Sequence, residues 1–425
     1  MSAPGGRSRP PCTATSPPEF IEELGRYDGA VSEIAPPFLA FARPSITERE
    51  KQAVLEVLDS GWLTTGGRTR EFEAAFAETV GSPYAIALNS ATAGLHLALE
   101  ALGVGPDHEV IVPTWTFAAS AEVVAYLGAR PVLVDVDPVT LNATPEAIRA
   151  AVTPRTRAVV VVHFGGRPMA IAELVDALAR TDVAIVEDSA HAFPSRIGGP
   201  GGRLAGTFGR VGVYSFYATK TITTGEGGML VTEDEALADR VRLMSLHGIS
   251  RNAWNRYTAA GSWYYEIEDV GYKYNMTDMA AALGLVQLSR ATELLEARRR
   301  LEASYRSRLA GSSVADLLDL PGDESDGSHA WHLFVVRLRL DGLRIDRAAV
   351  IDGLKALGIG TSVHFIPLHL HPYYRRRWGY GPDDLPIATA EYERVLSLPI
   401  WPGMTDGDVD RVVAGLVATL AAGRR

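Results

Sequence analysis

Cysteine, lysine and long apolar runs are all scarce in this chain of 425 residues. Cys12 is its single cysteine, which excludes an intrachain disulfide, and no signal-like segment begins the sequence, so we expect a cytoplasmic protein. No apolar run approaches the roughly 18 residues that cross a membrane. The net charge of −10 argues against nucleic acid as a partner. Only four of the 41 basic residues are lysines: Lys51, Lys220, Lys273 and Lys355.

Three common motifs are also missing. The sequence contains no G-x-G-x-x-G, no G-x-x-x-x-G-K-[ST] and no G-x-S-x-G. It therefore lacks the fingerprint of a dinucleotide-binding Rossmann site, a P-loop and the nucleophile elbow of a serine hydrolase.

Short apolar runs alternate with helical patterns between Tyr84 and about Thr232. This alternation predicts an α/β fold with a mostly parallel sheet covered on both faces, in which ligands bind beyond the carboxyl ends of the strands. The expected strands are Ala85–Leu88, Glu109–Pro113, Val132–Val136, Ala158–Val162, Val183–Val186, Val211–Phe216 and Met229–Thr232. The expected helices are Glu48–Leu58, Thr92–Leu102, Ala118–Leu127, Pro145–Val152 and Ala170–Ala179, with a break at the Gly66–Gly67 pair.

Three regions are expected along the chain. Residues 1–36, rich in Pro, Gly and Ser, predict a disordered or loosely packed tail. Residues 37–285 would form a large domain and residues 286–425 a smaller α+β domain, with one long helix over Thr277–Leu309 between them. The smaller domain would contain strands Ala330–Leu340 and Thr361–Ile366 and helices Arg347–Leu357, Ala388–Val395 and Asp406–Ala421.

Polar and aromatic residues follow the first two of the expected strands. The turn Asn89–Gly94 opens a helix that Ser90 or Thr92 could cap, and its free N–H groups suit a phosphate, although a plain helix cap is the alternative. Trp115 and Phe117 follow the next strand and would either face a flat ligand or pack in the core.

A carboxylate also closes a buried strand, because Glu187 and Asp188 follow Val183–Val186. A buried acid costs free energy unless it is partnered, and a protonated heterocyclic nitrogen is one partner that would explain it. The alternative is an aspartate that caps a helix.

Lys220 is the best candidate for a functional lysine. Lys51 and Lys355 lie in amphipathic helical patterns and Lys273 in a Tyr-rich loop, whereas Lys220 follows a strand and precedes a Thr/Gly-rich turn. A lysine beside an acid-anchored ring and a phosphate cradle describes a site for pyridoxal 5'-phosphate (PLP), where the amine forms a Schiff base and the acid keeps the ring nitrogen protonated.

Three histidines, His364, His369 and His371, cluster near the C-terminus. The run contains no carboxylate or thiolate, and Pro367 and Pro372 interrupt its spacing, so we expect packing or substrate contact rather than a metal site. A metal hydrolase built on this cluster is the distant alternative.

With these motifs together, the chain resembles the DegT/DnrJ/EryC1/StrS family of sugar aminotransferases from about Phe41 to Leu420. The resemblance implies the three-layer αβα fold of PLP-dependent transferases of fold type I, with a large sheet domain and a smaller C-terminal α+β domain. The residues that carry it are Ser60–Gly66, Asn89–Gly94, Val134–Asp137, Glu187–Asp188 with His191, Ser215–Phe216, Lys220–Gly228, Gly271–Asp278 and His364–Tyr374.

The resemblance also implies roles for single residues. Lys220 would hold PLP as a Schiff base and move the proton between the substrate and the cofactor, and Asp188 would pair with the ring nitrogen. Phe117 would stack on the ring. His191 stands near the ring hydroxyl, where the family often has Gln. Ala91, Thr92 and Ser215 would hold the cofactor phosphate, and Ser90 would be a further cofactor-binding residue.

Family members are homodimers with shared sites, and Tyr272–Asn275 matches the loop that reaches the phosphate in the partner subunit. The family often has Asn where this chain has Lys273 and Arg where it has Asn275, so either residue could meet that phosphate.

The implied reaction moves nitrogen from an amino acid, by family habit L-glutamate, to a keto sugar carried on a nucleotide, with C4 favoured over C3. Lys220 argues against the dehydratase branch of the family, which has His at this position. The alternatives are an aminotransferase for a cyclitol or another keto compound, and a PLP-binding regulator of the same family.

Overall fold

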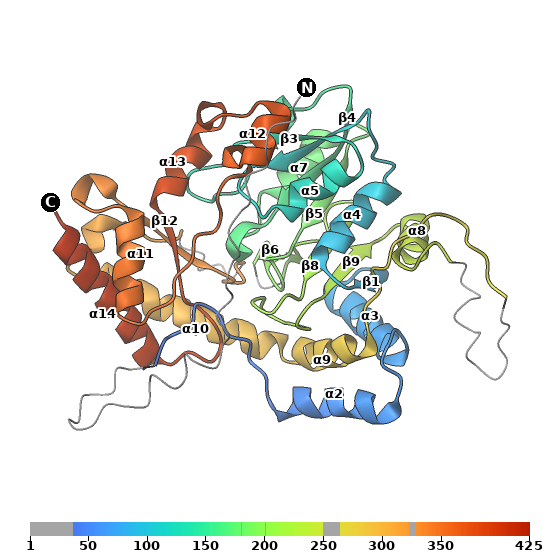
Figure 1. Cartoon of the computed structure of the whole chain (residues 1–425), viewed down its shortest axis with the longest axis horizontal. Coiled ribbons are helices and arrows are strands. Elements are labelled where there is room, and N and C mark those ends of the chain that lie inside the picture. Colours follow the sequence, from blue (N-terminus) through green and yellow to red (C-terminus); the bar gives the residue numbers. More distant parts are fainter. Residues whose placement is uncertain (1–36, 180, 200, 250–263, 323–327) are drawn as a thin grey trace, which may run out of the picture. The chain divides into compact units, whose positions relative to one another are not determined.

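A seven-stranded sheet forms the centre of the fold, with the strand order β1-β9-β8-β5-β4-β2-β3 (Figure 1). Strands β2, β3, β4, β5 and β8 are parallel, and β9 runs antiparallel to both β1 and β8. The predicted mostly parallel sheet is therefore confirmed. The strands are β1 (Tyr84–Leu88), β2 (Glu109–Pro113), β3 (Arg130–Val134), β4 (Thr156–Val162), β5 (Ala184–Asp188), β8 (Val211–Ser215) and β9 (Gly228–Thr232).

The computed structural model describes residues 37–179, 181–199, 201–249, 264–322 and 328–425. Phe38–Arg425 form one compact unit by their contacts. The predicted tail over residues 1–36 lies outside the described residues, and the predicted domain boundary after residue 285 stays a prediction. No helix in the described part of the chain combines the length and the apolar character that a membrane crossing needs.

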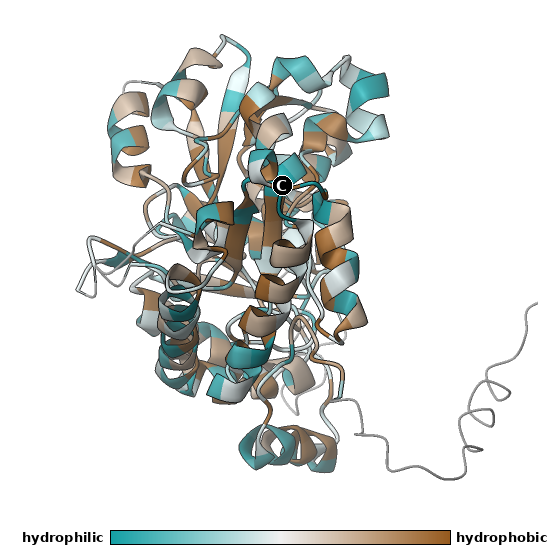
Figure 2. Ribbon diagram, turned by 90° about the vertical axis from the view of Figure 1, so that its left-hand side faces the viewer, coloured by the Kyte–Doolittle hydropathy of each residue, from teal (hydrophilic) through white to brown (hydrophobic). Residues whose placement is uncertain are grey.

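Both faces of the sheet are covered by helices, because side chains alternate between two apolar layers. Ile86 and Leu88 join one cluster with α4, α5 and α8, whereas Ala85 and Ala87 join another with α3 and α9. Farther along the sheet, α6 and α7 cover the second face. The strands are largely brown in Figure 2, as burial on both faces requires. The helices are α2 (Glu48–Ser60), α3 (Gly67–Val80), α4 (Ala91–Ala101), α5 (Ala119–Tyr126), α6 (Pro145–Ala150), α7 (Ile171–Leu178), α8 (Glu235–Ser245), α9 (Asp278–Ser289) and α10 (Ala291–Ala310).

Helix α4 approaches the sheet closely through a glycine. A Cβ atom at Gly94 would lie 2.7 Å from Val213 Cγ1 on β8, so only glycine lets the helix sit this near the strand. Ser90 is the N-cap of α4, since its hydroxyl accepts a hydrogen bond from Ala93 N at 3.1 Å. The start of α4 is thereby fixed beside the carboxyl end of β8.

The C-terminal part forms a second, antiparallel sheet in the order β10-β11-β12. Helices α10, α11 and α14 surround its apolar core. The elements here are β10 (Leu318–Asp319), β11 (Phe334–Leu338), α11 (Arg347–Ala356), α12 (Pro372–Trp378), α13 (Pro386–Arg394), β12 (Val395–Leu398) and α14 (Asp406–Gly423). A two-stranded hairpin of β6 (Arg196–Ile197) and β7 (Arg203–Leu204) follows β5.

Two predicted elements are wrong. The long helix over Thr277–Leu309 is two helices, α9 and α10, because the backbone at Arg290 leaves the helical region (ψ 4°) while its buried side chain pairs with Glu50 and Glu293. The strand predicted over Thr361–Ile366 is an extended loop with a single bridge, between Ser362 and Ser397.

The prediction also missed α3, α8 and β12. Helix α3 begins at the Gly66–Gly67 pair, where the sequence predicts only a break in the chain. Its start is stabilised from a distance in sequence, because the Asp278 carboxylate accepts hydrogen bonds from Gly66 N at 2.7 Å and Thr69 N at 2.9 Å. Such a cap cannot be recognised from local sequence.

Candidate active site

A cavity of about 460 Å³ lies where β4, β5 and β8 end and α4 begins. Ligands bind at this edge in parallel α/β sheets. Eight of the ten predicted site residues line it: Ser90, Ala91, Thr92, Phe117, Asp188, His191, Ser215 and Lys220. The other two predicted residues, Lys273 and Asn275, do not line this cavity.

Asp188 is the last residue of β5 and is 5% exposed. Its carboxylate accepts hydrogen bonds from Ser120 Oγ at 2.7 Å and from Ala190 N at 3.1 Å. Burial raises the pKa of this carboxyl group, although those two donors and the positive charge of Lys220 oppose the shift. A carboxylate desolvated to this degree favours a cationic partner in the cavity, and a protonated ring nitrogen fits that requirement.

Lys220 lies in the turn that follows β8, where its backbone N–H donates to Tyr217 O at 2.9 Å. Burial lowers the pKa of its ammonium group to about 8, an effect that Asp188 opposes and the buried cation Arg298 reinforces. A neutral amine is the form that condenses with an aldehyde, so this environment prepares Lys220 to form a Schiff base.

Lys220 should therefore be the most reactive lysine of the cofactor-free protein near neutral pH. With a pKa of about 8, its neutral fraction exceeds that of an ordinary lysine, whose pKa is about 10.4, by roughly a hundredfold or more. We expect reductive alkylation with a small aldehyde to rise at Lys220 with a midpoint near pH 8. Peptide mass spectrometry of the four lysines measures this. Labelling of Lys220 that rises only above about pH 10 would contradict it.

The first turn of α4 supplies the phosphate end of the cavity. The Ser90 hydroxyl is occupied as the N-cap, which leaves the N–H groups of Ala91 and Thr92 among the unbonded donors of a helix N-terminus. Gly228 lies directly behind this turn, since a Cβ atom there would be 2.6 Å from Ala91 N. The backbone of β9 therefore packs closely against this turn, whose residues line the cavity together with Ser215.

His191 is a buried, neutral imidazole. Its Nδ1 accepts a hydrogen bond from Gly165 N at 3.2 Å, which leaves the proton on Nε2. Burial lowers the pKa of this imidazole well below its usual range, and the charge of Lys220 acts in the same direction. His191 can thus donate a hydrogen bond from Nε2, as a glutamine amide would.

The two aromatic residues after β2 have different environments. Phe117 is 63% exposed and lines the cavity, whereas Trp115 is fully buried and packs edge-on against Phe164 in the core. Trp115 therefore packs in the core, whereas Phe117 lies where it can contact a flat ligand.

The three C-terminal histidines have separate environments, and His371 stands at the N-cap position of α12. His364 lines the cavity, and its Nδ1 lies 2.9 Å from Ser397 Oγ, while burial lowers the pKa of its imidazole to about 4. His369 is fully buried between Thr114 Oγ1 (2.8 Å) and Thr389 Oγ1 (2.9 Å). No group of three or more His, Cys, Asp or Glu side chains among the described residues could hold a metal ion.

Lys273 and Asn275 instead contact each other, and Asn275 Nδ2 donates to Thr65 Oγ1 at 2.7 Å. Their strand-like segment runs beside the end of β1, with Asn89 N donating to Tyr274 O at 2.8 Å. A contact of either side chain with a cofactor phosphate stays a prediction.

Several residues that line the cavity or support its walls are absent from the sequence-based predictions. Ser120, which holds Asp188, lies inside α5 and resembles any small helical residue in the sequence. His332 and Phe365 also line the cavity and come from the C-terminal part of the chain. Tyr217 lies just before the motif Lys220–Gly228 and Glu226 lies within it, so both could have been found from that motif.

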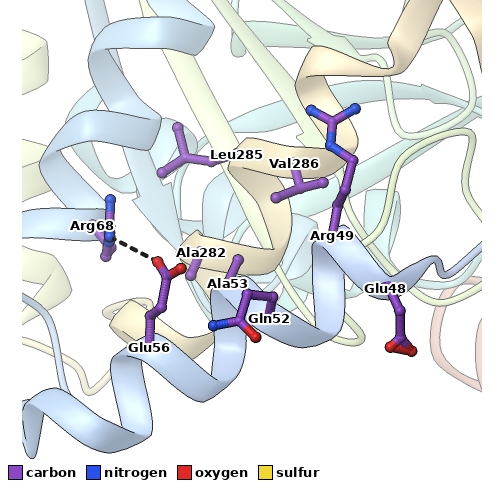
Figure 3. A pocket seen from close by; sticks show the side chains of 9 residues that line it. All are labelled: Glu48, Arg49, Gln52, Ala53, Glu56, Arg68, Ala282, Leu285 and Val286. Carbon is purple, nitrogen blue, oxygen red and sulfur yellow. Dashed lines mark hydrogen bonds and ion pairs between the residues drawn. The ribbon is translucent and has the colours of Figure 1, made fainter.

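A second hollow, of about 520 Å³, lies between α2 and α9 (Figure 3). Its floor is apolar and its rim is charged, with Arg68 and Glu56 paired at 3.5 Å. None of the predicted site residues lines it. Its lining residues are Glu48, Arg49, Gln52, Ala53, Glu56, Arg68, Ala282, Leu285 and Val286.

Comparison with known proteins agrees with the geometry of the cavity that Asp188 and Lys220 line. Residues 44–417 match the DegT/DnrJ/EryC1/StrS aminotransferase family. The chain belongs to this family. Its relatives include the spore coat polysaccharide biosynthesis protein SpsC of Bacillus subtilis (strain 168), which is 46% identical over 377 residues, covering 88% of this chain and 95% of SpsC.

Solved structures of the family have the same fold. Spr1654 of Streptococcus pneumoniae in its PLP form has a TM-score of 0.82 and 31% identity, over 91% of this chain and 99% of that one. DesI, solved in the presence of its TDP-sugar product, has a TM-score of 0.78 and 35% identity, over 90% and 92% of the two chains. The DegT/DnrJ/EryC1/StrS fold and PLP dependence inferred from the sequence are confirmed, and this chain is a PLP-dependent aminotransferase of a sugar aminotransferase family.

Proposed function

We propose that this enzyme transfers an amino group from L-glutamate to the keto group of a nucleotide-linked deoxysugar, at C4 rather than C3. The observation that carries the proposal is the single cavity shared by buried Asp188, Lys220 and the start of α4. The family and the TDP-sugar product present with DesI support a sugar nucleotide as acceptor. The C4 preference and the glutamate donor follow from the family resemblance.

Bound PLP supplies an electron sink for the bonds at the amino-bearing carbon, and the residues of this chain supply everything else. Asp188 holds its negative charge against the ring nitrogen and keeps that nitrogen protonated. Because burial lowers the pKa of Lys220 to about 8, its amine can accept a proton near neutral pH and return it. We assign Lys220 as the acid–base group for the transfer.

The remaining walls orient and enclose the cofactor. His191 would donate from Nε2 to the ring hydroxyl, and Phe117 would contact the ring. The N–H groups of Ala91 and Thr92, with Ser215, would hold the phosphate. Tyr217, which is 47% exposed, lies on the same cavity and is available to contact the acceptor sugar.

We further propose a homodimer in which Lys273 or Asn275 reaches the cofactor phosphate of the partner subunit. The two side chains lie outside the cavity of their own chain, and Lys273 is exposed, which agrees with such a role. A cytoplasmic location stays a prediction of the sequence.

A panel of keto acceptors tests the proposal. The holoenzyme is incubated with L-glutamate and with 4-keto and 3-keto deoxysugars linked to UDP, GDP or dTDP, and 2-oxoglutarate release and amino-sugar formation are measured. We expect turnover of a 4-keto nucleotide sugar at least ~10-fold faster than of its 3-keto isomer, since one misplaced reacting carbon weakens alignment with the cofactor. If a free keto cyclitol is turned over fastest, the acceptor is a cyclitol and not a nucleotide sugar. If the protein binds the cofactor but turns over no acceptor, it is a regulator.

A further inference from the structure

Arg298 on α10 is a buried arginine with an unusual set of partners. It is 2% exposed, and no carboxylate among the described residues lies within ion-pair distance of it. Instead its Nη1 lies 3.1 Å from Trp331 O, 3.2 Å from His332 O and 2.9 Å from Ile400 O. Its Nε has no hydrogen-bond partner. Burying a charge without a counter-ion costs free energy, and packing alone does not account for a charge at this position.

Two of the three carbonyl groups that Arg298 contacts, those of Trp331 and His332, belong to the turn before β11, and the third, that of Ile400, follows β12. Trp331 has a positive φ of 50°, which is strained for a residue with a side chain and must be held by its surroundings. The turn packs against Gly166, where a Cβ atom would be 3.0 Å from His332 N and 3.2 Å from His191 O. The guanidinium therefore fixes a tight junction between this turn and the cofactor-ring side of the cavity.

This junction leads directly to His191. The His332 ring lies 4.4 Å from the His191 ring, centroid to centroid, and both line the cavity. The neighbouring Gly165 accepts a hydrogen bond from Leu333 N at 3.0 Å and donates the one that fixes the His191 tautomer. A displaced turn would therefore move both the ring beside His191 and the donor to its Nδ1.

The charge of Arg298 also reaches the site. The groups that act on Lys220 are Asp188, which favours its ammonium form, and Arg298, which opposes it. His191, His332 and His364 surround the same space, and burial keeps the pKa of each below its usual range. Removing the guanidinium should therefore raise the pH at which the lysine nitrogen loses its proton.

We propose that Arg298 is a positioning residue for the PLP site, which holds the Trp331–His332 turn against His191 and places a fixed positive charge behind Lys220. The inference rests on the roles proposed above for His191 and Lys220. It requires neither a particular sugar nor a particular donor.

The test compares three variants of the holoenzyme by the pH titration of the cofactor absorbance band and by thermal denaturation. Arg298→Met removes the charge, Arg298→Lys keeps it, and Arg290→Met is the control, because Arg290 is a buried arginine paired with Glu50 and Glu293 and lies outside the cavity. We expect Arg298→Met to raise the titration midpoint by about half a pH unit or more and Arg298→Lys to leave it within about 0.2 unit. Arg290→Met should lower the Tm without moving the midpoint.

A lower Tm with an unchanged midpoint in Arg298→Met, as in the control, would overturn the inference. If Arg298→Met does not fold, His332→Ala decides: about tenfold weaker PLP binding is expected because the ring beside His191 is lost, and unchanged binding would contradict the proposal. A wild-type protein that binds no PLP would instead refute the proposed function, so the two failures are distinct.

Discussion

Lys220→Ala is expected to abolish amino transfer, with a loss of kcat of at least ~10³-fold, because one substitution removes both the covalent attachment and the acid–base group. The fold should persist. The Lys220 side chain ends in a cavity rather than in a packed core, so alanine leaves no new void of consequence. Steady-state kinetics with L-glutamate and a keto nucleotide sugar, beside circular dichroism and Tm, measure both parts.

Lys355→Ala provides the matched control. Lys355 is exposed on α11 and makes no contact with the cavity, so its loss should leave kcat and Tm unchanged within error. If Lys220→Ala kept more than a tenth of wild-type turnover, the assignment of the acid–base group would be wrong.

Asp188→Asn is expected to lower kcat by about 10²–10³-fold or more, because a neutral amide cannot keep the ring nitrogen protonated although it matches the carboxylate in shape. The same change should alter Lys220. Asp188 favours the ammonium form, so its replacement should lower the Lys220 pKa below about 8, and the alkylation midpoint should move to lower pH. The Tm of the cofactor-free protein should not fall, since asparagine avoids burying a charge.

Asp135→Asn is the control for this substitution. Asp135 also follows a strand of the sheet, and its carboxylate accepts hydrogen bonds from Ile387 N and Ala388 N at 2.9 Å each, away from the cavity. Its replacement should cost stability rather than catalysis. Equal losses of kcat in the two variants would show that the effect of Asp188→Asn is structural.

The sheet could be predicted from the sequence because strands buried on both faces form continuous apolar runs, such as Ala158–Val162, that no helix of this length imitates. Helix ends are harder to predict where they depend on residues that are distant in the sequence. The start of α3 needs the Asp278 carboxylate, and the break between α9 and α10 accompanies the pairing of Arg290 with Glu50. These interactions join residues more than 200 positions apart, which no local pattern reveals.

The candidate site divides in the same way. Asp188, Lys220 and the α4 turn come directly at the ends of elements, and such positions share one edge of a parallel sheet, so their proximity could be predicted. The proximity of Ser120 and His332 to the site could not be predicted, because Ser120 is a small residue inside a helix and His332 comes from the turn before β11. The sequence also leaves open which of two neighbouring aromatic residues faces the cavity. Trp115 is buried in the core, whereas Phe117, only two residues later, is exposed.

Borohydride reduction of the holoenzyme, followed by peptide mass spectrometry, identifies the residue that carries the cofactor. We expect the reduced cofactor to stay covalently attached to Lys220 and to no other lysine. Attachment at Lys51, Lys273 or Lys355, or no covalent attachment in a protein that retains the cofactor, would contradict it.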